Sequence, residues 1–450
     1  MQRALVLDRN KKPLMPCHPA RARQLLKAGR AAVYRRYPFT IILKDREGGE
    51  VQPVALKVDP GSRTTGLAVA AQFEGGWTVV WAANLEHRGL AVKAALDKRR
   101  AVRRGRRTRK TRYRPPRFDN RRREKGWLPP SLMSRVQNVR HWADRLAAFV
   151  PLSQIAVETV RFDTQLMQNP HISGVKYQQG ELAGYEVREY LLEKWGRKCA
   201  YCDAENVPLE IEHIRPKSRN GSNRTSNLLI SCHACNQAKG NRDVREFLAH
   251  DPARLKRILA QASQPLSDAA AVNATRYAIG DALKSLGVPV TFWSGGRTKY
   301  NRIRLGYPKD HWLDAACVGD NPAQASEKLQ AWGIRAVGRG RRQMCAMDKY
   351  GFPRTRPKAH KQVHGFQTGD LVKAVVPKGK RAGTHIGRVA VRTKGSFRVG
   401  RADGISWHYC TLIQRANGYE FFGTNGNTKQ DNAPPFLPPL KKVGFLEADS

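Results

Sequence analysis

Residues 199–241 read CAYCDAENVPLEIEHIRPKSRNGSNRTSNLLISCHACNQAKGN, and this stretch decides the organisation of the chain. Two Cys-x2-Cys pairs bracket it, Cys199 with Cys202 and Cys232 with Cys235. In a reducing compartment, pairs at this spacing favour metal binding over disulfide formation. Four thiolates suit tetrahedral zinc, and a closed four-cysteine site is structural. The sequence therefore predicts a structural Zn²⁺ held by all four cysteines, with a small subdomain between the two pairs.

The residues between the cysteine pairs suit phosphodiester chemistry. In residues 209–229 a predicted strand ends in Glu212 and His213, a basic loop follows, and Asn227 precedes a second apolar stretch. Hydrolysis of a phosphodiester needs a base to activate water, and an imidazole serves as that base near neutral pH. A carboxylate and an amide oxygen suit Mg²⁺. A lone histidine is more often structural, but this one lies within a constellation that indicates a nuclease.

The charge of the chain points to a polyanionic partner. Its 450 residues include 81 Lys and Arg against 37 Asp and Glu, a formal net charge of +44. Such a charge opposes folding by self-repulsion unless a polyanion neutralises it, so we expect nucleic acid as the partner. The sequence has no apolar run long enough to span a membrane and no signal-peptide pattern at its start. We therefore expect a cytoplasmic protein without a membrane partner.

Residues 90–114, LAVKAALDKRRAVRRGRRTRKTRYR, carry dense positive charge and favour a helix that ends before Pro115. A charge run is usually a solvated helix face or a disordered tail. This run is almost one-signed and lies between segments that are predicted to fold, so phosphate contacts would relieve its self-repulsion. The side chains that we predict to contact nucleic acid are Arg99, Arg100, Arg103, Arg104, Arg106, Arg107, Arg109, Lys110 and Arg112.

Three segments far apart in the sequence each place an acid in an apolar context. Asp59 ends the strand-like ALKVD, and Glu158 lies inside the strand-like IAVETV. His311 and Asp314 share one face of a predicted helix because they are three residues apart. A charge in a buried strand is costly unless it is paired or bound to metal. Each acid alone fits an ordinary salt bridge, but together they predict a site where two divalent ions clamp the attacking and leaving oxygens.

The remaining segments frame these sites. Residues 54–83 alternate as strands, and Gly61 and Gly66 are predicted to allow tight turns there. Residues 331–358 are rich in Gly, Arg and Pro and predict a linker. Beyond it, short strands alternate with turn residues, which favours a small β-barrel. We therefore expect an α/β multidomain protein.

The stretch between the cysteine pairs resembles the HNH endonuclease family, whose ββα-metal module it would form. The resemblance implies that His213 is the general base and that Glu212 and Asn227 hold one Mg²⁺. Many members of that family have a histidine at the last motif position, where this chain has Asn236. Asn236 therefore stays outside the predicted ligand set.

The acidic segments resemble a RuvC nuclease, an RNase H-like mixed sheet, that is split into three parts. RuvC sites use an Asp, a Glu and a terminal His/Asp pair, which match Asp59, Glu158, His311 and Asp314. The resemblance implies that these four residues are catalytic and hold two Mg²⁺ ions. The HNH module would be inserted between the second and third parts.

The motif order, the PLMP string at 13–16 and the β-rich tail resemble the IscB family of transposon-encoded, RNA-guided DNA endonucleases. The resemblance implies a structured guide, the omega RNA, and a double-stranded DNA target with a short adjacent motif. In that family HNH cuts the guide-paired strand and RuvC cuts the displaced strand. It also implies a protein monomer within a ribonucleoprotein that associates with the nucleoid when on target.

The resemblance divides the chain into eight segments. They are a PLMP domain at 1–52, RuvC-I at 53–90, an arginine-rich bridge helix and basic loop at 91–126, RuvC-II at 127–195, HNH with zinc knuckles at 196–250, RuvC-III at 251–330, a linker at 331–358 and a C-terminal domain for the target-adjacent motif at 359–450. Two alternatives stay open. An unguided HNH/RuvC nuclease of the homing or junction-cutting type would not need the full order of segments. A catalytically silent nucleic-acid-binding protein predicts broken acid sites, yet the acids are present.

Overall fold

The structure is a computed structural model of the chain. It describes residues 2–108, 124, 126–159, 183–263, 267–338, 345, 347–356 and 360–423, with the backbone alone at 183–186, 189, 193 and 267–269. The chain forms two compact units, Met1–Thr159 together with Tyr277–Ser450, and Val160–Arg276. In the part of the chain that is described, no helix combines the length and apolarity needed to cross a membrane.

The first unit opens with a small four-stranded sheet and one helix. Its elements are β1 Ala4–Leu7, β2 Pro13–Cys17, α1 Pro19–Lys27, β3 Ala31–Arg35 and β4 Thr40–Leu43. The strand order is β2-β1-β4-β3, and β1 runs parallel to β4. The PLMP string forms most of β2. Helix α1 starts with a proline, and His18 caps it by accepting a hydrogen bond from the backbone N–H of Ala20 at 3.2 Å.

A mixed seven-stranded sheet forms the centre of the first unit, in the order β11-β8-β5-β6-β7-β12-β20. Its strands are β5 Val54–Pro60, β6 Thr64–Phe73, β7 Gly76–Glu86, β8 Gln154–Glu158, β11 Val290–Trp293, β12 Trp332–Ala336 and β20 Tyr419–Gly423. The strands β5, β6 and β7 form an antiparallel meander, whereas β8 runs parallel to β5 and β11 runs parallel to β8. The strands expected over 54–83 and in IAVETV are confirmed.

The two faces of this sheet have separate cores, because side chains alternate along each strand. The helices of the unit are α2 Gly89–Thr108, α3 Pro130–Ala147, α10 Gly295–Arg304 and α11 His311–Ala316, and α9 Ser267–Lys284 continues from the second unit into the first. On β6, Leu67 shares a core with Trp142 of α3. The next residue, Ala68, shares the opposite core with Leu313 of α11. The small side chain on that face leaves room for α11 to approach the sheet.

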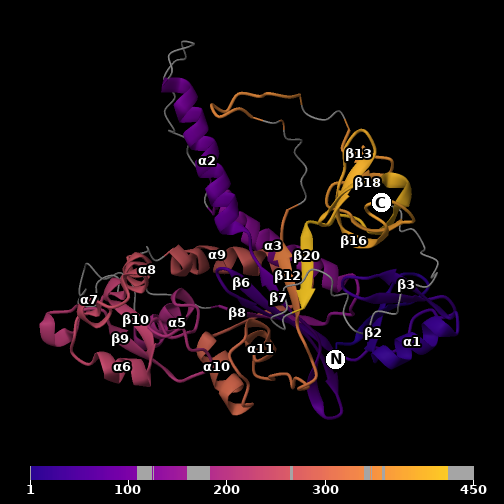
Figure 1. Ribbon diagram of the computed structural model, residues 1–450. Helices are drawn as coiled ribbons and strands as arrows, with labels where there is room; N and C mark the ends of the chain where they lie inside the picture. Colours follow the sequence, from indigo (N-terminus) through magenta and orange to yellow (C-terminus); the bar gives the residue numbers. More distant parts are fainter. Residues whose placement is uncertain are drawn as a thin grey trace. The chain divides into compact units, whose positions relative to one another are not determined.

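Two strands of the central sheet, β12 and β20, come from the predicted linker and the predicted C-terminal domain. Strand β12 lies at the start of the predicted linker, yet it pairs parallel with β7 and its Ile334 is fully buried. The linker prediction is therefore wrong for these residues. Strand β20 lies in the predicted C-terminal domain but pairs with β12, beside which Figure 1 shows it. A five-residue strand that contains Gly and Arg carries too little pattern to reveal this, and the burial comes from partners far away in the sequence.

The second unit is built on a two-stranded antiparallel sheet. Its elements are α5 Ala183–Lys194, β9 Leu209–His213, η2 Lys217–Arg219, η3 Thr225–Asn227, β10 Leu228–Cys232, α6 His233–Lys239, α7 Val244–Phe247 and α8 Pro252–Ala262. One core contains Leu191 of α5, Leu229 of β10 and Ile258 of α8. The predicted limits of 196–250 are therefore too narrow. Two strands alone bury too little apolar surface, so the flanking helices complete the core.

A separate five-stranded antiparallel sheet lies in the C-terminal segment of the first unit. Its strands are β15 Leu371–Val376, β16 Gly383–Ala390, β17 Ser396–Val399, β18 Ala402–Ser406 and β19 Cys410–Gln414, in the order β18-β17-β16-β15-β19. A short pair, β13 Gln362–Val363 and β14 Phe366–Gln367, precedes it, and η4 Trp407–Tyr409 precedes β19. The short strands are confirmed, and closure into a barrel stays a prediction.

Candidate active sites

The four cysteines of the second unit come together as their spacing predicted. Their sulfur atoms all lie within 4.8 Å of one another, and the Sγ atoms of Cys202 and Cys232 are 3.8 Å apart. Zn–S distances of about 2.3 Å in a tetrahedral site separate sulfur pairs by about 3.8 Å. The donor set therefore fits a structural zinc. Among the described residues, no other group of three or more His, Cys, Asp or Glu side chains brings its ligand atoms this close.

Glu212 is buried on β9, and both of its carboxylate oxygens are engaged. Oε1 accepts a hydrogen bond from Nζ of Lys239 at 2.6 Å, and Oε2 accepts one from the Tyr201 hydroxyl at 2.6 Å. Burial, together with the nearby Glu212 carboxylate, raises the pKa of Tyr201 far above its usual range, which keeps the phenol a donor. Lys239 is 1% exposed, so loss of either charge would leave the other buried and unpaired.

His213 ends β9 and points away from the face that carries Glu212, because neighbouring strand residues alternate. Its Nε2 lies 2.9 Å from Oδ1 of Asn223, and its carbonyl oxygen accepts a hydrogen bond from Lys239 at 2.9 Å. With the Asn223 oxygen as acceptor, Nε2 carries the proton and Nδ1 is the basic nitrogen. The sequence pattern did not single out Asn223, which lies in the basic loop.

Asn227 fastens the basic loop that follows β9. Its Oδ1 accepts from the backbone N–H of Arg215 at 2.9 Å, and its Nδ2 donates to the carbonyl oxygens of Arg215 and Ser222 at 3.0 and 2.8 Å. Each of these oxygens of Glu212 and Asn227 accepts one hydrogen bond, which leaves it a second lone pair. The Mg²⁺ ligand set implied by the family resemblance stays a prediction.

Asn236, which stood outside the predicted ligand set, faces a different carboxylate. Its Nδ2 donates to Oε2 of Glu210 at 2.6 Å, and Nδ1 of His233 lies 2.9 Å from Oε1 of the same residue. The hydrogen bonds from Asn236 and His233 lower the pKa of Glu210. The sequence spacing could have indicated this contact. His233 and Asn236 share one face of α6, and Glu210 and Glu212 share one face of β9.

The second candidate site gathers acids from β5, β8 and α11 in the first unit. Strands β5 and β8 pair in parallel, so Asp59 and Glu158 lie at neighbouring strand ends. Nδ1 of His311 lies 3.3 Å from Oδ2 of Asp59, and Asp314 is 3% exposed on the same helix as His311. All four predicted residues therefore meet at one edge of the central sheet.

Gly66 allows α11 to reach this edge. A Cβ atom at Gly66 would lie 1.8 Å from the carbonyl oxygen of His311 and 2.9 Å from the backbone nitrogen of Trp312. The prediction of a tight turn at Gly66 is wrong, because the residue lies inside β6, opposite Asp59. Its role is the close approach of another backbone. Gly61, by contrast, does lie in the connection between β5 and β6.

Burial and crowding raise the pKa of two acids in this site, Glu158 and Asp314. The pKa of Glu158 rises to about 8, first because burial disfavours the charged carboxylate and then because Asp59 lies nearby. Burial likewise raises the pKa of Asp314, although the neighbouring Lys309 opposes the rise. Acids in this state bind a cation favourably. Carboxylate oxygens and an imidazole also match the donor preferences of divalent ions, so the residue types fit Mg²⁺.

Two cations that the sequence reasoning missed complete this site. Nε of Arg302 lies 2.9 Å from Oδ1 of Asp314, and Nζ of Lys309 lies 2.8 Å from Oδ2. Arg302 comes from α10, and Lys309 precedes α11 by two residues. The Lys309 signal was present in the KDHWLD string, whereas Arg302 shows no local pattern that separates it from other basic residues.

The arginine-rich segment forms α2 as far as Thr108. The exposed arginines of this helix are Arg99, Arg100, Arg103, Arg104 and Arg107. Arg106 is half-buried, and its guanidinium lies 5.7 Å from the ring centre of Phe352, so part of this helix packs on protein. Arg109, Lys110, Arg112 and the helix end before Pro115 lie outside the described residues.

Two known protein families match parts of the chain. Residues 4–180 match the RRXRR protein family, and residues 199–252 match the HNH endonuclease family. No curated protein matches the chain. Residues 4–180 are thus similar to an RRXRR protein and residues 199–252 to an HNH endonuclease, which agrees with the motifs in those two stretches.

Solved structures of Cas9 enzymes also match. Cas9 of Streptococcus thermophilus in complex with the GGAA PAM is 12% identical, with a TM-score of 0.22, over 58% of this chain and 32% of that chain. The Type II-C Cas9 enzyme from Actinomyces naeslundii is 18% identical, with a TM-score of 0.16, over 43% of this chain and 29% of that chain. The chain therefore spans about a third of the length of these Cas9 chains.

Proposed function

We propose that the chain is an RNA-guided endonuclease that cuts both strands of DNA by metal-dependent phosphodiester hydrolysis. The observation that carries the proposal is the acid site of the first unit, where Asp59 lies beside His311 although the two are 252 positions apart in the sequence. That site lies in a different compact unit from the HNH endonuclease match. Two separate candidate sites in one chain suit two cuts, one on each strand.

In the HNH unit, His213 is the proposed general base for cleavage of the guide-paired strand. Its Nε2–H donates to Asn223, which orients the ring and leaves Nδ1 to accept a proton from the attacking water. Glu212 anchors β9 to α6 through the buried Lys239. Glu212 and Asn227 stay the proposed ligands of one Mg²⁺ ion at this site, which would stabilise charge on the phosphate.

In the acid site, Asp59, Glu158 and Asp314, with His311 beside Asp59, would hold the two Mg²⁺ ions of the proposal. When bound, the ions lower the pKa of water and stabilise charge on the phosphate. The Asp59 carboxylate accepts from Nδ1 of His311, which leaves Nε2 to take a proton from water. Lys309 and Arg302 neutralise Asp314 and hold it in place. This site would cut the displaced strand.

The proposed nucleic-acid partners are a guide (omega) RNA and a double-stranded DNA target with a short adjacent motif. The net charge of +44 and the exposed arginines of α2 support contacts with phosphate groups. Base pairing by a guide carries sequence specificity while a protein grips backbone and reads a short duplex motif. The five-stranded C-terminal sheet is the proposed reader of that motif, and one protein copy would act in each ribonucleoprotein.

The division of labour is tested by strand-resolved cleavage. We expect Asp59→Ala to slow cutting of the displaced strand alone and His213→Ala to slow cutting of the guide-paired strand alone. Each rate should fall by at least about 100-fold. Asp320→Ala is the control, because this nearby acid pairs with Arg297 at the surface. Strand-specific end-labelling of a plasmid or duplex target reads both cuts. Loss of both cuts, or of neither, in one of the single variants would contradict the two-site assignment.

Guidance itself is tested by sequencing the RNA that co-purifies with the chain when it is expressed with its native flanking sequence. One abundant structured RNA with a variable end, and cleavage directed by that end, is the expected result. Heterogeneous RNA together with guide-independent cleavage would favour the unguided nuclease. Nucleic-acid binding without any cleavage would favour the catalytically silent alternative.

A further inference from the structure

A cavity of about 420 Å³ lies in the first unit, and none of the predicted catalytic residues lines it. Its walls come from α3, from the chain just before and within the start of α2, and from the chain segments that follow β12 and precede β20. This volume falls in the range of about 300–1,000 Å³ that is usual for small-molecule sites. The cavity therefore has room for a group the size of a nucleotide.

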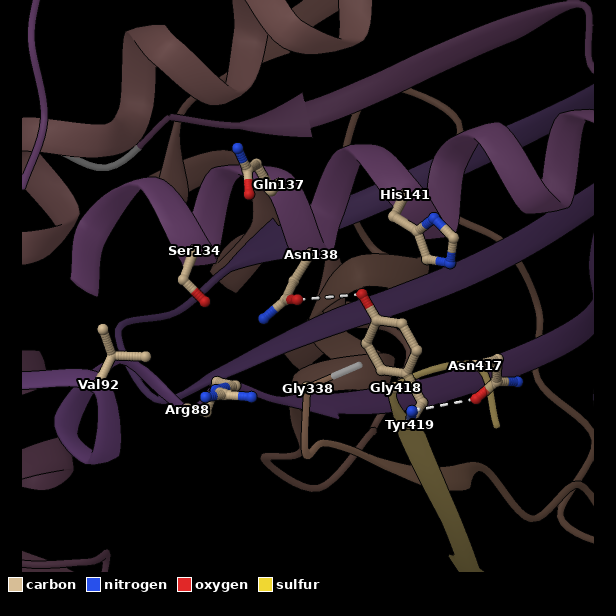
Figure 2. Close-up of a pocket in the computed structure, with 10 residues that line it drawn as sticks. All are labelled: Arg88, Val92, Ser134, Gln137, Asn138, His141, Gly338, Asn417, Gly418 and Tyr419. Atoms are coloured by element: carbon tan, nitrogen blue, oxygen red, sulfur yellow. Dashed lines mark hydrogen bonds between the residues drawn. The ribbon is translucent and has the colours of Figure 1, made fainter. Parts of the chain in front are cut away.

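One wall is a polar stripe on α3. Ser134, Asn138 and His141 are spaced by four and three residues, so they share one helix face. Figure 2 shows these side chains directed toward the ring of Tyr419 and toward Arg88. Oδ1 of Asn138 accepts a hydrogen bond from the Tyr419 hydroxyl at 3.0 Å, which fixes the two walls together. The wall thus offers hydroxyl and amide groups in a set arrangement.

A second feature is a flat aromatic platform. The rings of His141 and Tyr419 stack with centroids 5.4 Å apart and planes 5° apart. Tyr419 is 6% exposed, and Asn417 fixes its backbone by accepting from its N–H at 3.0 Å. Unpaired bases stack on aromatic and histidine rings and hydrogen-bond to neighbouring side chains along their edges.

The third feature is a positive charge held at the cavity. Nη1 of Arg88 donates to the carbonyl oxygen of Val337 at 2.6 Å and lies over Gly338, where a Cβ atom would sit 1.5 Å from it. Among the described residues, no carboxylate side chain lines the cavity. Arg88 comes one residue before α2, and Val92 of α2 also lines the cavity. The cavity is therefore continuous with the arginine-rich helix.

We propose that this cavity receives one unpaired nucleotide of the nucleic acid bound along α2. The base extends the His141 and Tyr419 stack, the polar groups of Ser134 and Asn138 face its edge, and its phosphate lies toward Arg88. The proposal rests on the nucleic-acid binding of the proposed function but not on either cleavage step. The nucleotide can come from RNA or from DNA, and the experiment separates the two.

The first test fills the cavity. Ser134→Trp places an indole where the base would lie, and Ala148→Trp adds the same bulk at the exposed end of α3 as a control. Binding of the full-length protein to single-stranded RNA and DNA dodecamers is measured across a salt series. We expect Ser134→Trp to weaken binding by about tenfold, because one stacked base is lost. The salt slope falls by no more than about 0.7, since at most the one phosphate contact with Arg88 is lost with the base.

The second test keeps the proposal open to refutation if Ser134→Trp does not fold. Gln137→Glu adds a negative charge to the lining, whereas Gln72→Glu makes the same change at an exposed position near the β6–β7 turn. Both are conservative changes of exposed glutamines. We expect Gln137→Glu to weaken binding at least about threefold more than Gln72→Glu, because only the first charge repels a phosphate beside Arg88.

Photo-crosslinking determines whether the nucleotide belongs to RNA or to DNA. The protein is crosslinked to RNA that carries 4-thiouridine and to DNA that carries 4-thiothymidine, and the crosslinked peptides are then mapped. A crosslink to the peptide with His141 or the peptide with Tyr419, lost in Ser134→Trp, supports the proposal and names the source. Equal binding by each cavity variant and its control would overturn the cavity proposal alone. Failure of the wild-type protein to bind either oligonucleotide would overturn the proposed function with it.

Discussion

At the scale of single residues, the four-cysteine cluster leads to the most direct prediction about folding stability. Four sulfur atoms within 4.8 Å of one another hold the two knuckles of the second unit, whose sheet has only two strands. Because such a site does not exist in the unfolded chain, zinc bound there would contribute directly to folding. We therefore propose that the cluster stabilises the fold of this unit.

Cys199→Ser should remove zinc and destabilise the second unit by at least about 3 kcal/mol, because one of four thiolate ligands is lost. Cys410→Ser is the control, since Cys410 lies outside the cluster in β19. Elemental analysis and thermal unfolding followed by calorimetry measure the two effects. An unchanged zinc content with an unchanged melting temperature would reject the structural zinc assignment.

At the scale of elements, the contact between α11 and β6 sets the geometry of the acid site. Gly66→Ala would push the backbone of α11 outward and so move His311 and Asp314 away from Asp59. We expect a loss of about 1–3 kcal/mol in stability and slower cutting of the displaced strand, with the guide-paired strand cut as in wild type. Gly75→Ala is the matched control, because a Cβ atom there meets nothing within 4 Å. Equal cleavage by the two variants would show that the close approach is not required.

The contact between α5 and α8 predicts a pH dependence of the second unit. Nζ of Lys194 donates to the carbonyl oxygen of Ala262 at 2.9 Å, and burial lowers the pKa of Lys194 to about 8. Its ordinary value is 10.5, so between pH 8 and 10.5 the unfolded state binds more protons than the folded state. The free energy of unfolding attributable to Lys194 therefore rises with pH across this window and falls as the pH drops through 8.

Lys194→Met removes this titration while keeping the length of the side chain. The difference in free energy of unfolding between wild type and variant should grow in favour of wild type from pH 8 to 10.5. Denaturant unfolding at several pH values, read by far-ultraviolet circular dichroism, measures the difference. If the difference in free energy of unfolding did not change with pH, Lys194 would have the same pKa in the folded and unfolded states.

At the scale of the whole molecule, the net charge of +44 should make the proposed nucleic-acid binding strongly dependent on salt. Arg103→Gln combined with Arg107→Gln removes two exposed charges from α2. The slope of log affinity against log salt should shrink by about 0.7–0.9 for each lost phosphate contact. Arg106→Gln is the comparison, because its half-buried guanidinium packs near the ring of Phe352 and should contribute less to phosphate binding. Fluorescence anisotropy at several salt concentrations gives the slopes, and equal slopes for the two variants would contradict phosphate binding by this face of α2.

The chemistry-bearing residues could largely be predicted from the sequence, because they follow local patterns. The Cys-x2-Cys pairs, the Glu212–His213 strand end and the acids in apolar strands each combine a residue type with a spacing or a context. What these side chains touch could not be predicted in the same way. Lys239 donates to one oxygen of Glu212, and Asn227 accepts a hydrogen bond from the loop backbone, contacts that no local sequence pattern records.

By itself, the sequence determined the four-cysteine cluster, the strands that carry Asp59 and Glu158, and the basic character of α2, since periodicity, spacing and charge are properties of short stretches. Only the tertiary structure decided that β12 and β20 complete the central sheet, that α5 and α8 belong to the core of the second unit, and that Gly66 serves a close approach. It also decided that a cavity lies beside α2. The physical reason is that burial and packing depend on partners that lie far away in the sequence, and a short stretch does not record which partner will cover it.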